Sequence, residues 1–374
     1  MPNLAILGAG GIGATFGAYM ARAGLAPVLI DPWFHHVEAI RENGLTLLSP
    51  EDEFNVPIRI LHIDEFPEIR QPINHLFIAL KSYDTEWALR LAQPYLAPTA
   101  TIVSLQNGVN EETLIRLGER RRTVGCVVAL SAELVQPGVV RRTSGPEWPA
   151  GVLGELDGQE RVRTKNLSRL LSSVGKTTIT DNIWGELWAK LTLNTFNNSL
   201  SGATGFTTRE LWSNPRAIEV EIHVAGECAE VAEKLGIDME SVLFDISPKE
   251  LVSAHRGNAS AWNSVSAKLN RAADKRRGKR ENRSSLLQDL FRKRRTEIDY
   301  LNGYVCGKGL KAGVKTDWTA AVWRLVRQVE RGSLIPEPAN LDLLDLSAAS
   351  LSGDDRGQHQ TRRRSNSREA QPRG

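Results

Sequence analysis

The sequence predicts an α/β amino-terminal domain with a doubly wound, mostly parallel sheet, followed by an all-α carboxy-terminal domain. In the first half, short apolar runs alternate with helical patterns, the order expected when helices cover both faces of a parallel sheet. Beyond about residue 181 the patterns are almost entirely helical. A chain of 374 residues is long enough for two such domains, each with its own core.

The first strand, Leu4–Leu7, runs into a glycine-rich turn and then a helix. The turn consists of Gly8, Ala9, Gly10, Gly11, Ile12 and Gly13. Such a turn presents backbone N–H groups and the positive end of a helix to a pyrophosphate. Gly8 permits the turn, Gly10 lets the backbone approach the phosphates, and Gly13 lets the helix pack against the strand. We therefore predict a Rossmann-type dinucleotide site at this turn.

The second strand, Val28–Asp31, ends in a carboxylate roughly twenty residues after the turn. An acidic side chain there accepts hydrogen bonds from the adenosine ribose and repels the 2′-phosphate of NADP. The sequence therefore favours NAD(H). A glycine turn without a ligand is the alternative, and the surrounding strand, helix and acid argue against it.

Further strands and helices complete the predicted sheet domain. The strands are Leu76–Leu80, Thr101–Leu105 and Val124–Leu130, the helices lie near Thr85–Leu96, Glu111–Leu117 and Val162–Val174, and shorter strands lie around Gly138 and Gly154. Ligands bind beyond the carboxyl ends of strands in such sheets. Lys81 and Asn107 follow two of these ends, so both are candidates for the site. His35 and His36 are assigned to a loop.

The second half is predicted to be a helical domain. Its candidate helices are Trp184–Asn198, Pro215–Leu235, Pro248–Arg256, Ser284–Gly313 and Asp317–Arg331. We place the boundary near Asp181, which gives domains over 1–181 and 182–335. The segment 336–374 is predicted to be an extended, disordered, basic tail.

A polar row lies on the first of these helices. Lys190, Asn194 and Asn198 are spaced at i, i+4 and i+8, which places them on one face. Asparagine is a poor helix former, so the row predicts a polar wall of a cleft. A solvated helix face is the alternative. Glu297, in a later helix, is a candidate to orient or charge-stabilise the lysine.

The composition is that of an ordinary soluble protein, with 41% hydrophobic and 24% charged residues. No apolar run approaches the ~20 residues that span a bilayer, and no secretion signal is evident. Cys126, Cys228 and Cys306 are few and far apart, which fits free thiols in a reducing cytoplasm. The histidines lack ligand spacing, so we predict no metal site.

The formal net charge of +3 arises in the tail, where six arginines oppose three carboxylates over residues 353–374. A segment so polar buries too little apolar surface to fold. Nucleic-acid binding through Arg362–Arg364 is an alternative that we do not favour. The basic runs Lys275–Arg283 and Arg292–Arg295 lack a recognition motif and are expected to be exposed helix ends and loops.

Several motifs, in this order, resemble the ketopantoate reductase (2-dehydropantoate 2-reductase) family over about residues 1–330. They are Gly8–Gly13, Lys81-Ser82, Gln106–Gly108, Glu186–Lys190 with Asn194 and Asn198, and Ser285–Gln288 followed by Thr296–Tyr300. The resemblance implies a Rossmann domain, a helical domain and an active site in the cleft between them. It also implies reduction of ketopantoate, or a close 2-keto acid, to the 2-hydroxy acid with NAD(P)H.

The resemblance also implies roles for the matched residues. Lys190 would be the general acid, and Lys81 and Glu297 would complete the cofactor and catalytic environment. The substrate would be held by Asn107, Asn194, Asn198 and Ser285. Hydride addition to a carbonyl leaves an alkoxide that needs a proton and positive charge, and an ammonium supplies both. Burial would lower the pKa of Lys190, and Glu297 would raise it.

Two positions depart from the family pattern. Members commonly use NADPH, with a basic residue just after the second strand. This chain has Asp31 there, so NAD(H) is favoured and NADP(H) stays open. Thr208 stands where some members have a substrate-binding asparagine, which leaves the keto acid open.

Two other interpretations stay open. One is a two-domain hydroxyacid, opine or glycerol-phosphate dehydrogenase with a different substrate. The other is a non-catalytic dinucleotide-binding regulatory protein that uses the basic tail as an interaction arm. A homodimer is expected from the family alone.

Overall fold

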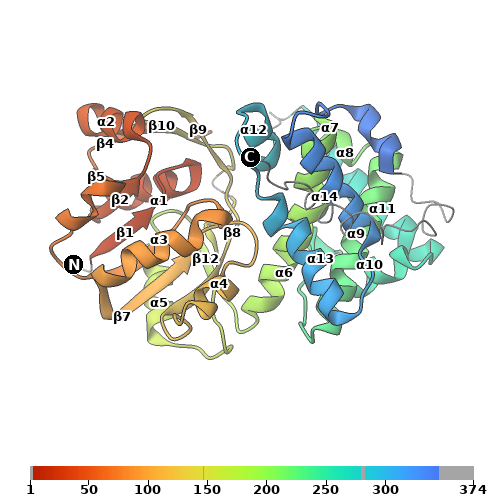
Figure 1. Cartoon of the computed structure of the whole chain (residues 1–374), viewed down its shortest axis with the longest axis horizontal. Coiled ribbons are helices and arrows are strands. Elements are labelled where there is room, and N and C mark those ends of the chain that lie inside the picture. The colour runs from red at the N-terminus through yellow and green to blue at the C-terminus, as the bar shows by residue number, and fades with distance from the viewer. Residues whose placement is uncertain (1–2, 146, 279–282, 345–374) are drawn as a thin grey trace, which may run out of the picture.

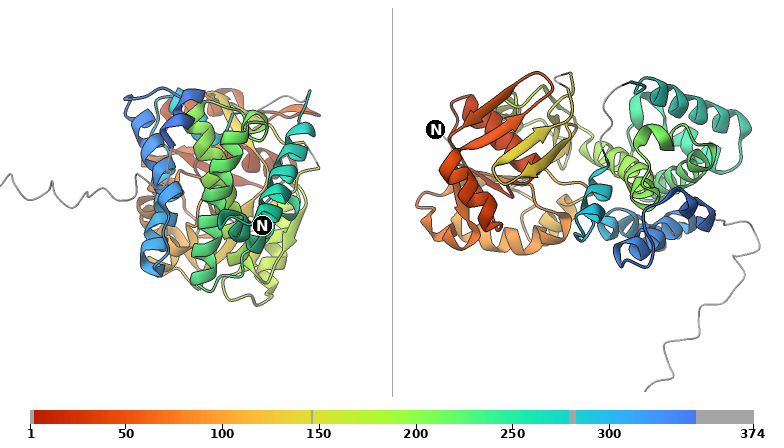
Figure 2. Two further views of the ribbon diagram at one scale, coloured as in Figure 1. Left: turned by 90° about the vertical axis from the view of Figure 1, so that its right-hand side faces the viewer. Right: turned by 90° about the horizontal axis from the view of Figure 1, so that it is seen from above.

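The protein is described by a computed structural model that covers residues 3–145, 147–278 and 283–344. A sheet domain and a helical domain lie side by side (Figure 1), and they remain side by side when seen from above (Figure 2). Within the described residues, no helix is both long and apolar enough to cross a membrane.

An eight-stranded sheet forms the centre of the sheet domain. Its strands are β1 (Leu4–Leu7), β2 (Pro27–Asp31), β5 (Arg59–His62), β6 (Ile73–Ile78), β7 (Leu96–Ser104), β8 (Thr123–Val128), β11 (Gly151–Glu155) and β12 (Thr177–Ile179). Their order is β12-β11-β8-β7-β6-β1-β2-β5, and every neighbouring pair is parallel except β8 and β11. The strand order reverses between β1 and β6, where dinucleotides bind in such sheets.

Helices cover both faces of this sheet. They are α1 (Gly11–Arg22), α2 (Phe34–Asn43), α3 (Thr85–Ala92), α4 (Glu111–Arg116) and α5 (Val162–Leu171), with 3₁₀ turns at Ile63–Glu68, Ser82–Asp84 and Gln93–Tyr95. Successive residues of β1 alternate between two apolar cores. One core contains side chains of α1 and α5, and the other contains side chains of α3 and α4. The predicted doubly wound sheet is confirmed.

A second sheet packs against α1, and the sequence patterns do not predict it as a separate layer. It consists of β4 (Glu53–Val56), β3 (Leu45–Leu48), β10 (Val139–Arg142) and β9 (Ala132–Gln136), in that spatial order. β3 and β10 pair in parallel although they lie far apart in the chain. Leu45, Leu47 and Val140 bury their side chains in the same core as α1.

The helical domain packs around one large apolar core that includes Trp188 and Trp212. Its described α-helices are α6 (Ile183–Leu193), α7 (Ser199–Thr204), α8 (Thr208–Leu211), α9 (Pro215–Lys234), α10 (Pro248–His255), α11 (Ala259–Asp274), α12 (Ser285–Phe291), α13 (Asn302–Ala312) and α14 (Asp317–Glu330). Short 3₁₀ helices cover Leu243–Asp245, Ile298–Tyr300 and Pro338–Leu344. Of these helices, α9, α10 and α14 confirm predicted ones, whereas α11 is not among those predicted.

Two predicted helices are not regular. The helix predicted over Trp184–Asn198 ends as an α-helix at Leu193 and continues as a π-helix over Asn194–Asn198, which we call the π segment. The long helix predicted over Ser284–Gly313 is wrong, because it is broken between α12 and α13. Lys293 takes a left-handed conformation with φ of 53° there, and the Thr296 N–H leaves the helical pattern to donate to Glu330 Oε1 at 2.6 Å.

Asn182 lies at the junction of the two domains, where α6 begins. Its side chain accepts a hydrogen bond from the Gly185 N–H at 3.1 Å, which caps the helix. Its Nδ2 also donates to the carbonyl of Asp238 and to Glu240 Oε1, each at 2.8 Å. These bonds tie the start of α6 to the loop that follows α9.

The chain after residue 335 is not entirely an extended tail. Pro338–Leu344 forms a 3₁₀ helix that buries Leu341 and Leu344 in the core of the helical domain. Asn340 Nδ2 donates to the carbonyls of Ala203 and Ile335, both at 2.8 Å. The prediction of an extended tail from residue 336 is therefore wrong for this stretch, and its remaining part, 345–374, lies outside the described residues.

Candidate active site

The glycine turn between β1 and α1 has a backbone that side chains would obstruct. Gly8 has φ of 96°, and a Cβ there would lie 2.8 Å from the Ala79 carbonyl oxygen. A Cβ on Gly13 would lie 1.9 Å from the Gly8 carbonyl oxygen, so the close approach of α1 to β1 requires glycine. A Cβ on Gly10 would meet no atom within 4 Å, which leaves open space beside the turn.

The first turn of α1 faces this open space. Gly10, the residue before the helix, provides no side-chain cap, and the first turn of α1 contains no acidic residue. The first N–H groups of a helix lack partners within the helix and favour an anion. Ala9 is buried, whereas Gly10, Gly11 and Ile12 are partly exposed. The turn therefore fits a pyrophosphate group.

Asp31 and His36 bind the two backbone polar groups of Ala9, its N–H and its carbonyl. The Ala9 N–H donates to Asp31 Oδ2 at 2.7 Å, and the Trp33 N–H donates to Asp31 Oδ1 at 2.8 Å. His36 Nδ1 accepts from the Gly138 N–H at 3.0 Å, so its Nε2 carries the proton and donates to the Ala9 carbonyl at 2.8 Å. Burial lowers the pKa of His36, which keeps the ring neutral.

The prediction that His36 lies in a loop is wrong, because it lies on α2 with no exposed surface. The spacing of His36, Val37 and Ile40 on the buried side of α2 is the helical pattern that reveals it. His36 therefore supports the glycine turn and joins it to the second sheet.

Lys81 lies between the two domains. Its ammonium forms ion pairs with Asp289 of α12 and with Glu297 Oε2, the latter at 3.3 Å. Burial alone would lower the pKa of Lys81, but the charges of Glu297 and Asp289 outweigh it and raise the pKa above its usual value. Glu297 Oε1 also accepts from the backbone N–H and the hydroxyl of Ser82, both at 2.9 Å.

The expected pairing of Glu297 with Lys190 is therefore wrong. Glu297 binds Lys81 and Ser82, and only burial shifts the pKa of Lys190, downward. Helix spacing does not reveal this arrangement because Glu297 lies in the loop after α12 and not on one continuous helix. Asp289, which the sequence patterns do not assign to the site, is the second carboxylate on Lys81.

Asn107, Asn194 and Asn198 form a hydrogen-bonded row across the domain boundary. Asn198 Nδ2 donates to Asn194 Oδ1 at 3.0 Å, and Asn194 Nδ2 donates to Asn107 Oδ1 at 3.1 Å. The Ser82 hydroxyl, which has a single proton to donate, also lies 2.9 Å from the Asn107 carbonyl oxygen, so this row lies beside the residues that bind Lys81. The structure thus brings these three predicted residues together.

Lys190 lies on α6, one helical turn before Asn194. It is half-buried, and its ammonium forms no hydrogen bond or ion pair with any residue that the structure describes. Burial lowers the pKa of Lys190 below its usual value. An ammonium without a partner, beside a row of amides, is suited to meet a ligand.

Ser285 begins α12 and is half-buried, with no side-chain hydrogen bond to the described part of the chain. Its neighbour Ser284 caps α12 by accepting from the Leu287 N–H at 3.2 Å. The Ser284 hydroxyl also lies 3.4 Å from the Asn198 carbonyl. The sequence patterns above leave Ser284 out of the site, although a serine just before an apolar helix is a recognisable cap.

The basic run Arg292–Arg295 is exposed, as predicted, but it also contacts the sheet domain. Arg292 Nη2 donates to the Leu134 carbonyl at 2.7 Å. The guanidinium groups of Arg294 and Arg295 lie 5.9 Å and 4.8 Å from the ring centroids of Trp33 and Tyr83. The loop between α12 and α13 therefore joins the two domains.

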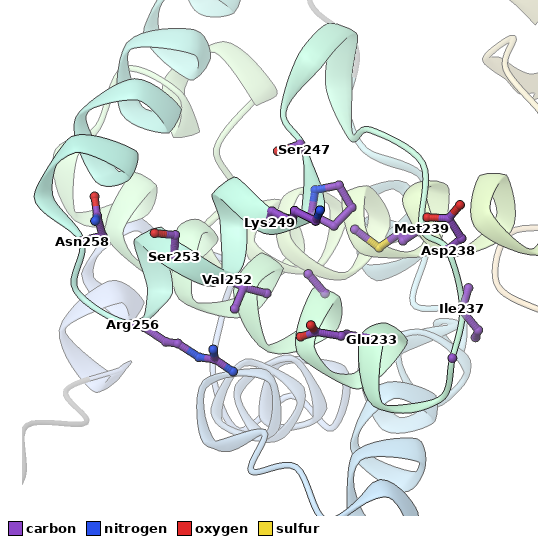
Figure 3. Close-up of a pocket in the computed structure, with 13 residues that line it drawn as sticks. Glu233, Ile237, Asp238, Met239, Ser247, Lys249, Val252, Ser253, Arg256 and Asn258 are labelled. Carbon is purple, nitrogen blue, oxygen red and sulfur yellow. The ribbon is translucent and has the colours of Figure 1, made fainter.

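A cavity of about 810 Å³ lies elsewhere, on the helical domain, between the end of α9 and α10 (Figure 3). Glu233, Asp238, Lys249 and Arg256 are among its lining residues, and none of the candidate site residues lines it. Within the described residues, no group of three His, Cys, Asp or Glu side chains is placed to hold a metal. Cys126, Cys228 and Cys306 are all free.

A dinucleotide-type sheet domain joined to a helical domain that offers a lysine and amides at their boundary defines a class, the two-domain nicotinamide-dependent oxidoreductases. The sequence model described as ketopantoate reductase PanE/ApbA matches residues 4–157, and that of its C-terminal region matches residues 182–330. The chain therefore belongs to the ketopantoate reductase family, whose members are oxidoreductases acting on CH–OH groups.

Individual relatives agree with this assignment. A 2-dehydropantoate 2-reductase from Pyrococcus abyssi is 27% identical over 328 residues, which cover 87% of this chain and 97% of the relative. The crystal structure of a PanE/ApbA family ketopantoate reductase from Ralstonia eutropha JMP134 has a TM-score of 0.72 at 29% identity, over 88% of this chain and 99% of that one. A D-mandelate dehydrogenase with NADH and anilino(oxo)acetate has a TM-score of 0.75 at 26% identity, over 88% and 98%.

Proposed function

We propose that this protein reduces 2-dehydropantoate, or a close 2-keto acid, to the 2-hydroxy acid, with Lys190 as the general acid. The observation that carries the proposal is the half-buried ammonium of Lys190, which has no partner among the described residues and lies one turn before Asn194, which itself bonds to Asn107 at the sheet. A nicotinamide dinucleotide would supply the hydride. The uncapped start of α1, the open space at Gly10 and the acid at Asp31 fit such a cofactor.

Lys190 would stabilise and protonate the oxygen of the substrate carbonyl. Burial lowers its pKa, which makes the ammonium a stronger acid than an exposed lysine. Because no carboxylate in the described part of the chain pairs with it, its charge would act on the developing alkoxide. The proton passes from Lys190 Nζ to the former carbonyl oxygen.

The amides of Asn107, Asn194 and Asn198 and the hydroxyl of Ser285 would bind the carboxylate and hydroxyl oxygens of the substrate. They orient it without adding net charge beside Lys190. Glu297 and Asp289 would act through Lys81, by holding its ammonium between the domains. In this proposal Glu297 is a positioning residue for Lys81 and Ser82.

We propose NAD(H) as the preferred cofactor because Asp31 ends β2. Each of its oxygens accepts one backbone N–H and keeps a further lone pair for a ribose hydroxyl. Its charge would repel a 2′-phosphate. Because members of the family commonly use NADPH, a preference for NADPH is the alternative outcome of the test.

A second candidate substrate is a bulkier 2-keto acid. The fold is as similar to a D-mandelate dehydrogenase as to ketopantoate reductases. Thr208, where some family members have a substrate-binding asparagine, bonds instead to Asn197 Oδ1 at 3.0 Å. A substrate pocket without that asparagine favours a different side chain on the keto acid.

The test is oxidation of NADH and NADPH by the full chain with a panel of 2-keto acids, ketopantoate and an aromatic keto acid included. Lys190→Ala should lower kcat by about three orders of magnitude, because the general acid and its charge are both removed. NADH binding should be unchanged, and Lys249→Ala, an exposed lysine at the outer cavity, should match the wild type. Near-normal turnover by Lys190→Ala would refute the proposal.

A further inference from the structure

The π segment places polar side chains on two sides. Asn194 and Asn198 belong to the row that reaches Asn107. Asn197 points the other way, into the helical domain, and is buried. A buried amide is costly unless its donors and acceptor are bonded, so its partners are structurally important.

Both ends of the Asn197 amide have a partner. Asn197 Nδ2 donates to Glu221 Oε1 of α9 at 3.3 Å, and the Thr208 hydroxyl of α8 donates to Asn197 Oδ1 at 3.0 Å. Asn197 is therefore held by two elements that the chain reaches only after the π segment. We call Asn197, Thr208 and Glu221 the rear network.

Glu221 is a buried acid that has no charged partner among the residues that the structure describes. Its exposed fraction is 1%, and burial raises its pKa to about 8 although the hydrogen bond from Asn197 acts in the opposite direction. The carboxyl group is therefore mostly neutral at pH 7. A neutral acid accepts the hydrogen bond of the Asn197 amide without placing a charge in the core of the helical domain.

Asn302 braces the π segment from another side. Its Nδ2 donates to the Thr195 carbonyl at 3.2 Å, and its Oδ1 accepts from the Ser199 hydroxyl at 2.5 Å. A π-helix shifts the hydrogen-bonding register of the backbone and is uncommon without such support. The segment is thus held by Asn302 and by the rear network.

We propose that Glu221, acting through Asn197 and together with Thr208, is a positioning residue that fixes the π segment so that Asn194 and Asn198 meet the substrate. The inference deepens the proposed function and rests on it, because it takes those two asparagines as the substrate-binding wall. Neither the sequence patterns nor the family resemblance assigned Glu221 or Asn197 to the site.

Glu227 provides a matched control on the same helix. It is also buried, and burial raises its pKa to about 7. Its carboxylate accepts from the N–H groups of Trp318 and Thr319 and from the Thr319 hydroxyl at 2.7 to 2.9 Å. It therefore holds the start of α14, and none of its hydrogen bonds to the described residues reaches the π segment.

The test compares Glu221→Leu, Glu221→Gln and Thr208→Val with Glu227→Gln in the full chain. Glu221→Leu should raise KM for the keto acid about tenfold while kcat changes less than about threefold and the Kd for NADH stays the same. Glu221→Gln keeps an acceptor for Asn197 and should restore KM to within about twofold. Thr208→Val removes one of the two bonds and should raise KM about threefold.

Glu227→Gln should lower the melting temperature without changing KM, which separates positioning from lost stability. A folded Glu221→Leu with wild-type KM, or a Glu221→Gln as impaired as Glu221→Leu, overturns the inference. Should Glu221→Leu fail to fold, an unchanged KM in Thr208→Val overturns it. Turnover retained by Lys190→Ala counts against the proposed function. If Lys190→Ala is inactive but Glu221→Leu and Thr208→Val keep the wild-type KM, the result counts against this inference alone.

Discussion

The glycine turn and the π segment are both irregular stretches that carry candidate ligand-binding groups, but they are fixed in different ways. The turn is set by its own backbone, through the φ of Gly8 and the missing side chain of Gly13. The π segment is set by side chains of other elements: Thr208, Glu221 and Asn302 bond to it from 11, 24 and 107 positions along the chain. The conformation of the turn is therefore fixed by local backbone geometry, and that of the π segment by tertiary contacts.

The largest predicted effect tests the local backbone geometry of the glycine turn. Gly13→Ala places a methyl group 1.9 Å from the Gly8 carbonyl oxygen, so the turn must open and NADH binding should weaken at least about 100-fold. Fluorescence titration with NADH measures it. Gly307→Ala, in α13 where a Cβ meets nothing within 4 Å, is the matched control and should bind NADH normally. Tight binding by Gly13→Ala would show that the turn tolerates a side chain.

An intermediate effect concerns the charge that supports the turn. Asp31→Asn removes the repulsion of a 2′-phosphate and should raise the NADPH to NADH ratio of kcat/KM about tenfold. His36→Gln replaces the neutral side chain that holds the same Ala9 peptide, so it should weaken both cofactors equally. A wild type that prefers NADPH, or a ratio that Asp31→Asn leaves unchanged, contradicts the assignment of Asp31.

The smallest effect separates Lys190 from Lys81. A general acid must be protonated, so kcat should fall as pH rises through the lowered pKa of Lys190. Glu297→Gln should move that midpoint by less than ~0.3 units, because Glu297 pairs with Lys81. Asp289→Asn, which removes the other carboxylate that pairs with Lys81, should also leave the midpoint nearly unchanged. A downward shift of about one unit in Glu297→Gln alone would place its charge on Lys190.

The sheet domain follows from local patterns in the sequence. Apolar strands, the glycine turn and Asp31 lie within a few tens of residues, and their structural meaning depends on neighbours in the chain. Local patterns do not reveal the second sheet, because its strands are short and β3 pairs with the distant β10. The loop prediction for His36 is wrong because it does not count His36 as part of the helical spacing of buried residues that continues with Val37 and Ile40.

The helical domain is predictable in outline, and its site less completely. The row of Lys190, Asn194 and Asn198 follows from helical spacing, and Asn107 from its place after a strand. The pairing of Glu297 with Lys81 does not follow from spacing, because it depends on the helix break at Lys293 and on the contact that Lys81 makes across the domain boundary. The rear network has no local pattern at all, since Asn197 and Glu221 lie on different helices.

The cap at Asn182 has a mechanical consequence. Its side chain fastens the beginning of α6 to Asp238 and Glu240, while Trp184 Nε1 donates to the Leu156 carbonyl of the sheet domain at 3.0 Å, so the start of α6 is held from both domains. Lys190 and the two asparagines after it therefore extend from an anchored end of the helix. Opening the boundary would break the amide bond from Asn194 to Asn107 together with the ion pairs of Lys81 with Asp289 and Glu297, and it would leave the spacing along α6 unchanged.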